Sequence, residues 1–396
     1  MKISYGKNVY GKEEINAVLN KLKKTTQMGD AVARFEYKIA KLFSKRYGLM
    51  VNSGSSALML ATNVLNFKKG DEIIAPCLNF GTAVSSIILS GATPILVDID
   101  VNTLQIDVNK IQKKITKKTK GIIVPNLIGN VPDWRKIKIL AKKYKLKIIE
   151  DSADTLGAKI NNKPTGIYSD ISITSFYGSH IISCAGNGGM FLTNDKKTYD
   201  RAKVLRSWGR MSTLIKDSEN INKRLDIKLN GYEYDKKFIF SEVGYNFEPS
   251  EIGASFGLAQ LKKLKENIAT RQINFARQCN FFSKYSEYFS NPIELSGCNT
   301  AWLAFPILIK ENAPFTRKQF QIFLEKRNIQ TRVVFTGNIL RQPMCKNIDK
   351  RVMTSGYPNA DSIMERGVLL PLHHGLTEKM FFRLHETIDE FIKKHT

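Results

Sequence analysis

Short apolar runs alternate with longer amphipathic stretches through the first half of the chain. Six of these runs are typical of buried strands: DEIIAP, TPILVDID, GIIVPN, LKIIEDSA, DISITSF and GMFLTND. Between them, SSALMLATNVLNF places Leu58, Ala61 and Leu65 on one helical face, and PDWRKIKILAKKYK has the same periodicity. The alternation predicts an α/β fold in which a mainly parallel, buried sheet carries helices on both faces.

The C-terminal part of the chain has a different order of elements. EPSEIGASFGLAQLKKLKENIATRQINFARQ is a long helical pattern, and it is followed by strand-like TAWLAFPILIK and IQTRVVF. TRKQFQIFLEKRN and EKMFFRLHETIDEFIKKH are helix-like. We therefore predict a large domain over residues 1–260 and a smaller α+β domain over residues 261–396.

Composition narrows the class of protein. No apolar run reaches the roughly 18 residues that span a bilayer, and the N-terminus MKISYGKNVYGKEE lacks the apolar core of a signal peptide. We expect a cytoplasmic protein without a membrane partner. The five cysteines are scattered, with no C-x-x-C pair and no histidine at metal-ligand spacing. Neither a metal site nor a disulfide framework is predicted.

The formal net charge of +25 raises the question of a nucleic-acid partner. Clustering of the cations would be needed for such binding. Here the lysines alternate with apolar residues, as in KIQKKITKKTK, which is typical of solvated helix faces. We expect no nucleic-acid partner, although a positive field would help to attract a diphosphate-bearing substrate.

Two local patterns are candidates for binding chemistry. VNSGSSAL is a turn that leads into a helix, where free backbone N–H groups can bind an anion such as a phosphate ester; Gly54 would allow close approach, and Ser55 and Ser56 would add donors. IIEDSADTLGA places Glu150 and Asp151 at the carboxyl end of a strand, where ligand sites of open α/β sheets lie. Ordinary helix capping and a solvated acidic turn remain the alternatives.

The order of motifs along the chain resembles one known family. NSGSSAL, GDEIIAPCLNFGTA, PILVDID, EDSADTLGA, SFYGSH, GNGGMFLTND, GYNFEPSEIGASFGLAQL and QTRVVFTGNILRQP follow one another as in the DegT/StrS-type sugar aminotransferases of the aspartate aminotransferase superfamily. The resemblance spans almost the whole chain. It implies fold type I of the pyridoxal phosphate (PLP)-dependent transferases, with a mainly parallel seven-stranded sheet flanked by helices and a smaller C-terminal domain.

The resemblance also implies a PLP site. Ser55, Ser56 and Ser175 match positions that hold the cofactor phosphate, and Asn246 matches one that reaches in from the other subunit of a homodimer. Asp151 matches the partner of the pyridine nitrogen. Further matches to the cofactor site are Gly54, Phe80, whose ring would stack on the cofactor, and Asp154.

His180 stands five residues beyond Ser175, where the family carries its Schiff-base lysine. An imidazole cannot condense with an aldehyde, so the cofactor is expected to be bound noncovalently. A lone histidine is usually structural. At this position, however, an unperturbed pKa of about 6.5 would allow His180 to take and return protons as the catalytic residue.

A histidine here is a mark of the nucleotide-sugar 3-dehydratase branch. TGNILRQP, RSWGR, TQMGDAVARFE and Asp154 also resemble that branch. Its CDP-sugar type carries an iron–sulfur cluster on cysteines, and the matching stretches GGMFLTND and WGRMSTLIKDSEN contain none. We expect no iron–sulfur cluster, as in the type that acts on GDP-4-keto-6-deoxymannose, with the nucleotide left open between GDP and CDP. IISCAGNGG departs from the branch, because it is longer and supplies Asn187 without a carboxylate.

The resemblance implies that glutamate converts PLP to pyridoxamine phosphate (PMP), which then removes the 3-hydroxyl of a nucleotide-linked 4-keto-6-deoxy sugar and releases ammonia. The product would serve surface polysaccharide synthesis. Arg332 and Asn338, in TRVVFTGN, are candidates to bind the glutamate carboxylate or the sugar hydroxyls. Two alternatives remain, a nucleotide-sugar aminotransferase and a noncatalytic relative that binds a sugar nucleotide.

Overall fold

A central sheet of seven strands organises the computed structural model, which describes residues 1–215 and 217–396. The strands lie in the order β1-β9-β8-β5-β4-β2-β3. Their bounds are Tyr47–Val51 for β1, Glu72–Pro76 for β2, Thr93–Val97 for β3, Thr119–Pro125 for β4, Lys147–Ser152 for β5, Ile171–Ser175 for β8 and Gly189–Thr193 for β9. β8, β5, β4, β2 and β3 pair in parallel, whereas β9 is antiparallel to both of its neighbours.

The predicted mainly parallel sheet is therefore confirmed. All six predicted strand runs form strands of it, and β1 completes the sheet next to β9. YGLMV was not singled out as a strand because its apolar run is short and contains a glycine.

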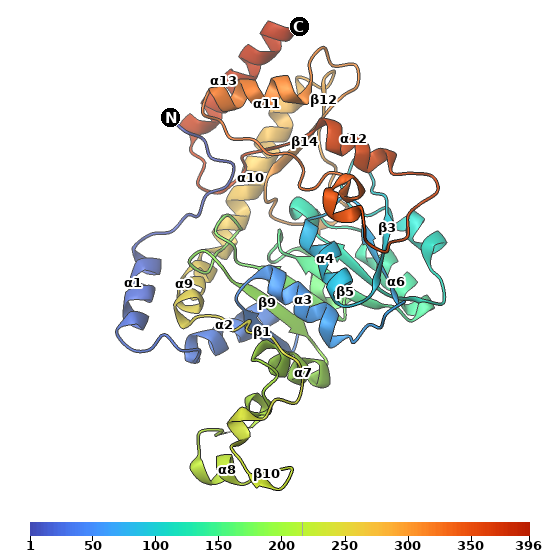
Figure 1. Ribbon diagram of the computed structural model, residues 1–396. Coiled ribbons are helices and arrows are strands. Elements are labelled where there is room, and N and C mark those ends of the chain that lie inside the picture. Colours follow the sequence, from blue (N-terminus) through green and yellow to red (C-terminus); the bar gives the residue numbers. More distant parts are fainter. Residues whose placement is uncertain (216) are drawn as a thin grey trace.

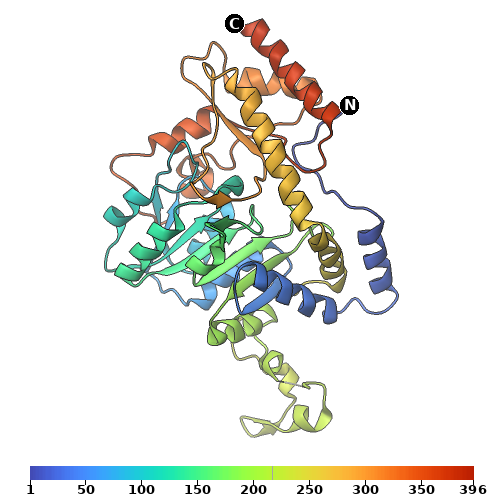
Figure 2. The ribbon, with the colours of Figure 1, turned by 180° about the vertical axis from the view of Figure 1, so that it is seen from behind.

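Side chains from β1 and β9 separate into two apolar cores. Leu49, Val51 and Phe191 belong to one core cluster, whereas Met50 and Leu192 belong to the other. Alternation along a strand sends successive side chains to opposite faces, so each core covers one face of the sheet. Figures 1 and 2 show helices on both sides of the strands.

The helices of this part of the chain have the bounds Lys12–Leu22 for α1, Asp30–Leu42 for α2, Gly54–Val64 for α3, Gly81–Leu89 for α4, Val108–Ile111 for α5, Trp134–Tyr144 for α6 and Lys196–Arg206 for α7. Of these helices, α3 and α6 were predicted from their periodicity, and the structure confirms both. The long pattern that begins at residue 248 is divided at Lys263 into α9 (Glu251–Lys262) and α10 (Leu264–Ser283). Outside the main sheet, β6 (Lys159–Ile160), β7 (Lys163–Pro164) and β13 (Cys298–Asn299) form a small antiparallel sheet of three strands in the order β13-β6-β7.

The C-terminal part forms a separate antiparallel sheet in the order β12-β14-β15. These strands span Phe289–Ser290, Phe305–Ile309 and Gly367–Leu370, and the accompanying helices are α11 (Arg317–Lys326), α12 (Pro358–Arg366) and α13 (Glu378–His395). The expected strand IQTRVVF is wrong: these residues make only isolated bridges, such as Arg332 to Leu369, and β15 provides the third strand. The proposed division after residue 260 remains a prediction.

An arm, residues 217–244, projects away from the body of the molecule (Figure 1). It contains α8 (Ile221–Leu225) and the hairpin of β10 (Lys228–Leu229) and β11 (Tyr232–Glu233). Most of its large apolar side chains are exposed, and Val243 is 95% exposed. Among the helices that the structure describes, none has the length and apolar character needed to cross a membrane.

Candidate active site

A cavity of about 500 Å³ lies where the parallel strands of the main sheet end. Ligand sites of open α/β sheets occupy this edge. Its walls include most of the residues that the sequence predicted for a site. These are Gly54, Ser55, Phe80, Asp151, Asp154, Ser175 and His180, with Asn187 beside them.

The N-terminus of α3 forms one wall of the cavity. A Cβ atom at Gly54 would lie only 2.6 Å from the Cβ of Ser175, so a glycine is needed for β8 to approach the helix. The Ser55 hydroxyl lies 3.3 Å from that of Thr82, at the start of α4. Free N–H groups, the positive end of the helix dipole and these hydroxyls together suit an anion such as a phosphate.

Ser56 does not line the cavity. Its backbone N–H donates to Ser53 Oγ over 3.1 Å, and the two hydroxyl oxygens lie 3.0 Å apart. Ser53 is the N-cap of α3 and itself lines the cavity. The capping interpretation therefore describes Ser56, whereas Ser55 is the serine of this pair whose side chain is available to a ligand.

Glu150 and Asp151 are neighbours in β5 and face opposite sides of the sheet. Glu150 is fully buried and accepts hydrogen bonds from Ser172 Oγ at 2.6 Å and from Asn126 Nδ2 at 3.0 Å. Asp151 lines the cavity, and its Oδ1 accepts from the Ala153 N–H over 3.0 Å. Burial raises the pKa of Asp151 to about 6, with a further contribution from the charge of Glu150. Only Asp151 can meet a ligand.

Asp154 brings a second carboxyl group to the cavity. Its Oδ2 accepts a hydrogen bond of 2.9 Å from the Ile128 N–H. Burial raises the pKa of Asp154 to about 7, and the nearby Asp151 adds to the shift. At neutral pH this carboxyl group is therefore poised between its protonated and ionised forms.

His180 lies just beyond the end of β8. Its Nδ1 is 3.3 Å from the carbonyl oxygen of Ser175, and its ring meets that of Tyr177 edge-on at 5.8 Å. Burial, together with the positive charge of Arg271, lowers the pKa of His180 to about 4. The imidazole is then neutral at neutral pH, and if Nδ1–H donates to Ser175, Nε2 is left as a proton acceptor.

Besides Ser56, three further predicted residues lie outside the cavity lining. Asn338 is buried, and its Nδ2 donates to Asp361 Oδ1 over 2.8 Å. The guanidinium group of Arg332 lies over the ring of Tyr5, with its central carbon 5.5 Å from the ring centroid. Asn246 is exposed beside the arm, where it pairs with Ser207 of the same chain.

Other cavity residues were not predicted. Tyr5 arrives from the N-terminal segment, which carries no local motif. Asn79 is fully buried, its Oδ1 accepts from the Phe80 N–H over 2.8 Å, and its Nδ2 has no partner among the described residues. Its place three residues after the end of the predicted strand DEIIAP was a signal that could have pointed to it. Phe335 meets Phe80 edge-on at 6.1 Å.

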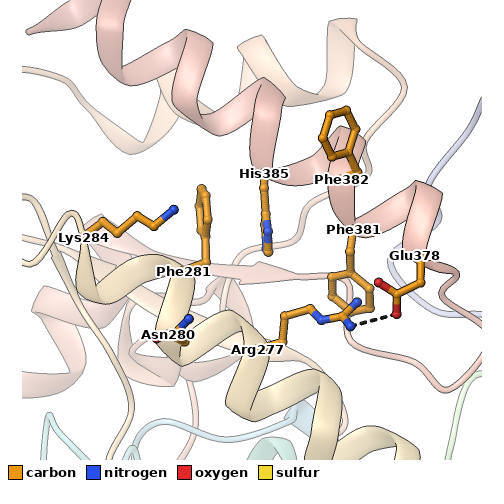
Figure 3. Close-up of a pocket in the computed structure, with 8 residues that line it drawn as sticks. All are labelled: Arg277, Asn280, Phe281, Lys284, Glu378, Phe381, Phe382 and His385. Carbon is orange, nitrogen blue, oxygen red and sulfur yellow. Dashed lines mark hydrogen bonds and ion pairs between the residues drawn. The ribbon is translucent and has the colours of Figure 1, made fainter.

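A second hollow, of about 340 Å³, lies between α10 and α13 and contains none of the predicted site residues (Figure 3). Its polar groups are largely engaged: Arg277 pairs with Glu378 at 2.7 Å, and the His385 ring stacks on Phe281 at 3.9 Å. Among the described residues, no group of three or more histidine, cysteine or acidic side chains is placed to hold a metal ion.

Comparisons with known proteins relate the whole chain to one family. The family model described as the DegT/DnrJ/EryC1/StrS aminotransferase family matches residues 8–389. The chain is 31% identical over 368 residues to the lipopolysaccharide biosynthesis protein RfbH of Salmonella typhimurium, covering 90% of this chain and 84% of that protein. It is 32% identical over 364 residues to the GDP-perosamine synthase of Escherichia coli O157:H7, covering 92% and 90%.

Solved structures agree over nearly the full length. The Escherichia coli GDP-4-keto-6-deoxy-D-mannose-3-dehydratase with bound hydrated PLP superposes with a TM-score of 0.88 at 30% identity, covering 98% of this chain and 100% of that one. A GDP-4-keto-6-deoxymannose-3-dehydratase with a trapped PLP-glutamate geminal diamine superposes with a TM-score of 0.87 at 28% identity, covering 97% and 99%. These neighbours confirm the predicted fold type I architecture.

Proposed function

This chain belongs to the DegT/DnrJ/EryC1/StrS aminotransferase family, and from that premise we propose that it is a PLP-dependent 3-dehydratase of a nucleotide-linked 4-keto-6-deoxy sugar. Glutamate would supply the amino group and leave as its keto acid. The products would be a 4-keto-3,6-dideoxy sugar nucleotide and ammonia, for surface polysaccharide such as O-antigen or capsule. The similarity to a lipopolysaccharide biosynthesis protein and to two dehydratase structures supports this role.

The observation that carries the proposal is the position of His180 in the cavity. It follows β8 at the position of the family's lysine, and no lysine is among the described residues that line this cavity. A neutral imidazole can accept a proton but cannot form a Schiff base. A cavity with this histidine and no lysine therefore supports elimination with a noncovalently bound cofactor rather than ordinary transamination.

The residues present fit PLP and PMP. The space beside Gly54, the Ser55 side chain at the start of α3 and the Ser175 side chain at the end of β8 form a cradle for the phosphate group. Asp151 would keep the pyridine nitrogen protonated, because a buried carboxylate strongly favours a cationic partner. The unpartnered Asn79 Nδ2 is a further donor for a bound ligand. When bound, the cofactor supplies the ring that withdraws electrons from the reacting carbon.

Residues of the chain itself would then accept and donate the protons. His180 Nε2 accepts a proton, and the resulting imidazolium can protonate the hydroxyl that leaves sugar carbon 3. The contact between Nδ1 and Ser175 holds the ring in place for both transfers. Since glutamate provides the two electrons that the deoxygenation consumes, the reaction needs no external reductant and no iron–sulfur cluster.

We also propose a homodimer in which Asn246 completes the cofactor site of the other subunit. Asn246 is exposed beside the arm rather than directed into the cavity of its own chain. The arm carries exposed apolar side chains that a second copy would cover: Ile221, Leu225, Leu229, Tyr232, Tyr234, Phe238, Phe240 and Val243.

The decisive experiment is to incubate the purified protein with PLP, glutamate and 4-keto-6-deoxy sugars linked to GDP or CDP, and to determine the product mass. Loss of one oxygen atom from the sugar, with release of ammonia, is the expected result. A stable sugar bearing an amino group would contradict the proposal.

One observation favours a sugar aminotransferase as the second candidate. The loop IISCAGNGG has nearly the aminotransferase spacing and brings Asn187 to the cavity wall without a carboxylate. If the wild-type protein releases an amino sugar, and His180→Lys raises that yield, the chain is an aminotransferase. If only the lysine variant makes amino sugar, the dehydratase assignment stands.

A further inference from the structure

The N-terminal segment is held by hydrogen bonds at Tyr5 and at the two residues before it. The Ile3 N–H donates to the Asn328 carbonyl over 2.9 Å, and the Tyr5 N–H donates to Gln330 Oε1 over 3.1 Å. His373 Nε2 lies 3.2 Å from the carbonyl oxygen of Ser4. These contacts fix the backbone of a segment that would otherwise be free to fray.

The same segment passes directly over the residue that precedes His180. A Cβ atom at Gly6 would lie 2.8 Å from the Cβ of Ser179, so the two backbones are in close contact here. Tyr5 and His180 both line the 500 Å³ cavity as a result. The first residues of the chain are thus part of the wall of the active site.

The Tyr5 hydroxyl is free for a ligand. None of the described residues hydrogen-bonds to it, although its ring is packed beneath the guanidinium group of Arg332. Burial and the nearby carboxyl group of Asp154 raise the pKa of the phenol well above its usual range. The hydroxyl therefore keeps its proton at neutral pH and acts as a hydrogen-bond donor.

The surroundings of Tyr5 indicate which ligand group it meets. Asp154 raises the pKa of the phenol, whereas the positive charges of Arg332 and Arg271 lower it, so charges of both signs act on the hydroxyl. A neutral sugar hydroxyl, which can donate as well as accept a hydrogen bond, is compatible with both. A phenol ring also provides an apolar face on which a sugar ring can pack.

We propose that Tyr5 is a specificity-determining residue whose hydroxyl donates a hydrogen bond to a hydroxyl group of the sugar bound next to His180. This inference rests on the proposed function, since it takes the sugar nucleotide as the substrate. Arg332 then acts as a positioning residue, because it holds the Tyr5 ring and does not itself line the cavity.

Tyr5→Phe tests the inference, because phenylalanine keeps the ring and its packing beneath Arg332. Tyr10→Phe is the matched control: Tyr10 lies on the same segment, is 54% exposed and packs edge-on against Phe256 outside the cavity. Two reactions are measured for each variant. They are the absorbance change of bound PLP on addition of glutamate, and the conversion of the sugar nucleotide by the aminated protein.

We expect Tyr5→Phe to lower kcat/KM of the sugar reaction about tenfold, while the rate of the glutamate reaction stays unchanged. Tyr10→Phe should change neither rate. An unchanged sugar reaction in Tyr5→Phe, or an equal loss of both reactions, would overturn the inference.

Calorimetric binding of the GDP- or CDP-linked sugar separates a failure of this inference from a failure of the proposed function. Binding that weakens about tenfold in Tyr5→Phe supports the contact even if the wild-type protein does not dehydrate the sugar, in which case only the reaction assignment is lost. Equal binding by wild type and Tyr5→Phe rejects the contact.

Discussion

Nδ1 of His180 lies 3.3 Å from the carbonyl oxygen of Ser175, the last residue of β8. This contact ties the proposed catalytic base to the strand that also helps to form the phosphate cradle. It selects the tautomer in which Nε2 carries the free lone pair. In the proposed function, one short stretch of backbone therefore aligns the cofactor with the group that transfers the proton.

Replacing His180 by asparagine should abolish the proton transfers without unfolding the protein. General acid–base catalysis contributes about 100-fold or more, so kcat of the dehydration should fall by at least that factor. PLP should still bind, which its absorbance spectrum would report. His395→Asn, at the end of α13, is the control and should retain full activity. A variant at His180 that keeps more than a tenth of the activity would refute the role of this residue.

Gly54→Ala should damage the phosphate cradle. The added Cβ would lie 2.6 Å from the Cβ of Ser175, closer than two such carbons can pack, so β8 or α3 must shift. We expect a loss of about 1–3 kcal/mol in the free energy of unfolding and at least tenfold weaker PLP binding, measured by thermal unfolding and absorbance titration. Gly11→Ala is the control, because an added Cβ there meets nothing within 4 Å.

Asp154 should make the stability of the cofactor-free protein depend on pH. Because its folded pKa of about 7 exceeds the usual value of 3.8, the folded state binds more protons between these two pH values, and the contribution of Asp154 to stability is lost as pH rises toward 7. Asp154→Asn should therefore stabilise the protein by about 1–2 kcal/mol at pH 8 and have little effect at pH 4.

The measurement for Asp154 is the difference in melting temperature between wild type and Asp154→Asn across this pH range. The stability of each protein also depends on His180, whose pKa is lowered from 6.5 to about 4, so that its contribution is lost as pH falls below 6.5. Because both proteins contain His180, this contribution cancels in the difference. A difference that does not vary with pH would contradict the prediction.

Val243→Asp should disrupt the proposed homodimer. Val243 is 95% exposed and lies near Asn246, so a new charge there would be buried without a partner if a second copy covers the arm. Light scattering should show a shift from dimer to monomer, with weaker PLP binding because Asn246 no longer reaches the other site. Ile139→Asp, on α6 and 67% exposed, should leave the assembly intact. If both variants have the mass of a dimer, the arm is not the interface.

Some features of this protein follow from neighbouring residues in the chain. The apolar runs predicted six of the seven strands, because strand burial leaves a direct mark in composition over a few residues. The glycine and serines after β1 predicted an anion site, since a helix start requires only a local turn. That a histidine stands at residue 180 is likewise a property of the sequence itself.

Other features depend on contacts between segments that are distant in the chain. Tyr5 reaches the cavity through pairing with residues 328–330, and no local pattern encodes that contact. Arg332 and Asn338 lie in a motif that resembles a ligand site, yet packing directs one behind Tyr5 and the other toward Asp361. The sequence by itself determined the central part of the main sheet and the chemistry available at the end of β8. Only the tertiary structure decided which side chains share the cavity, because that choice depends on how non-adjacent elements pack together.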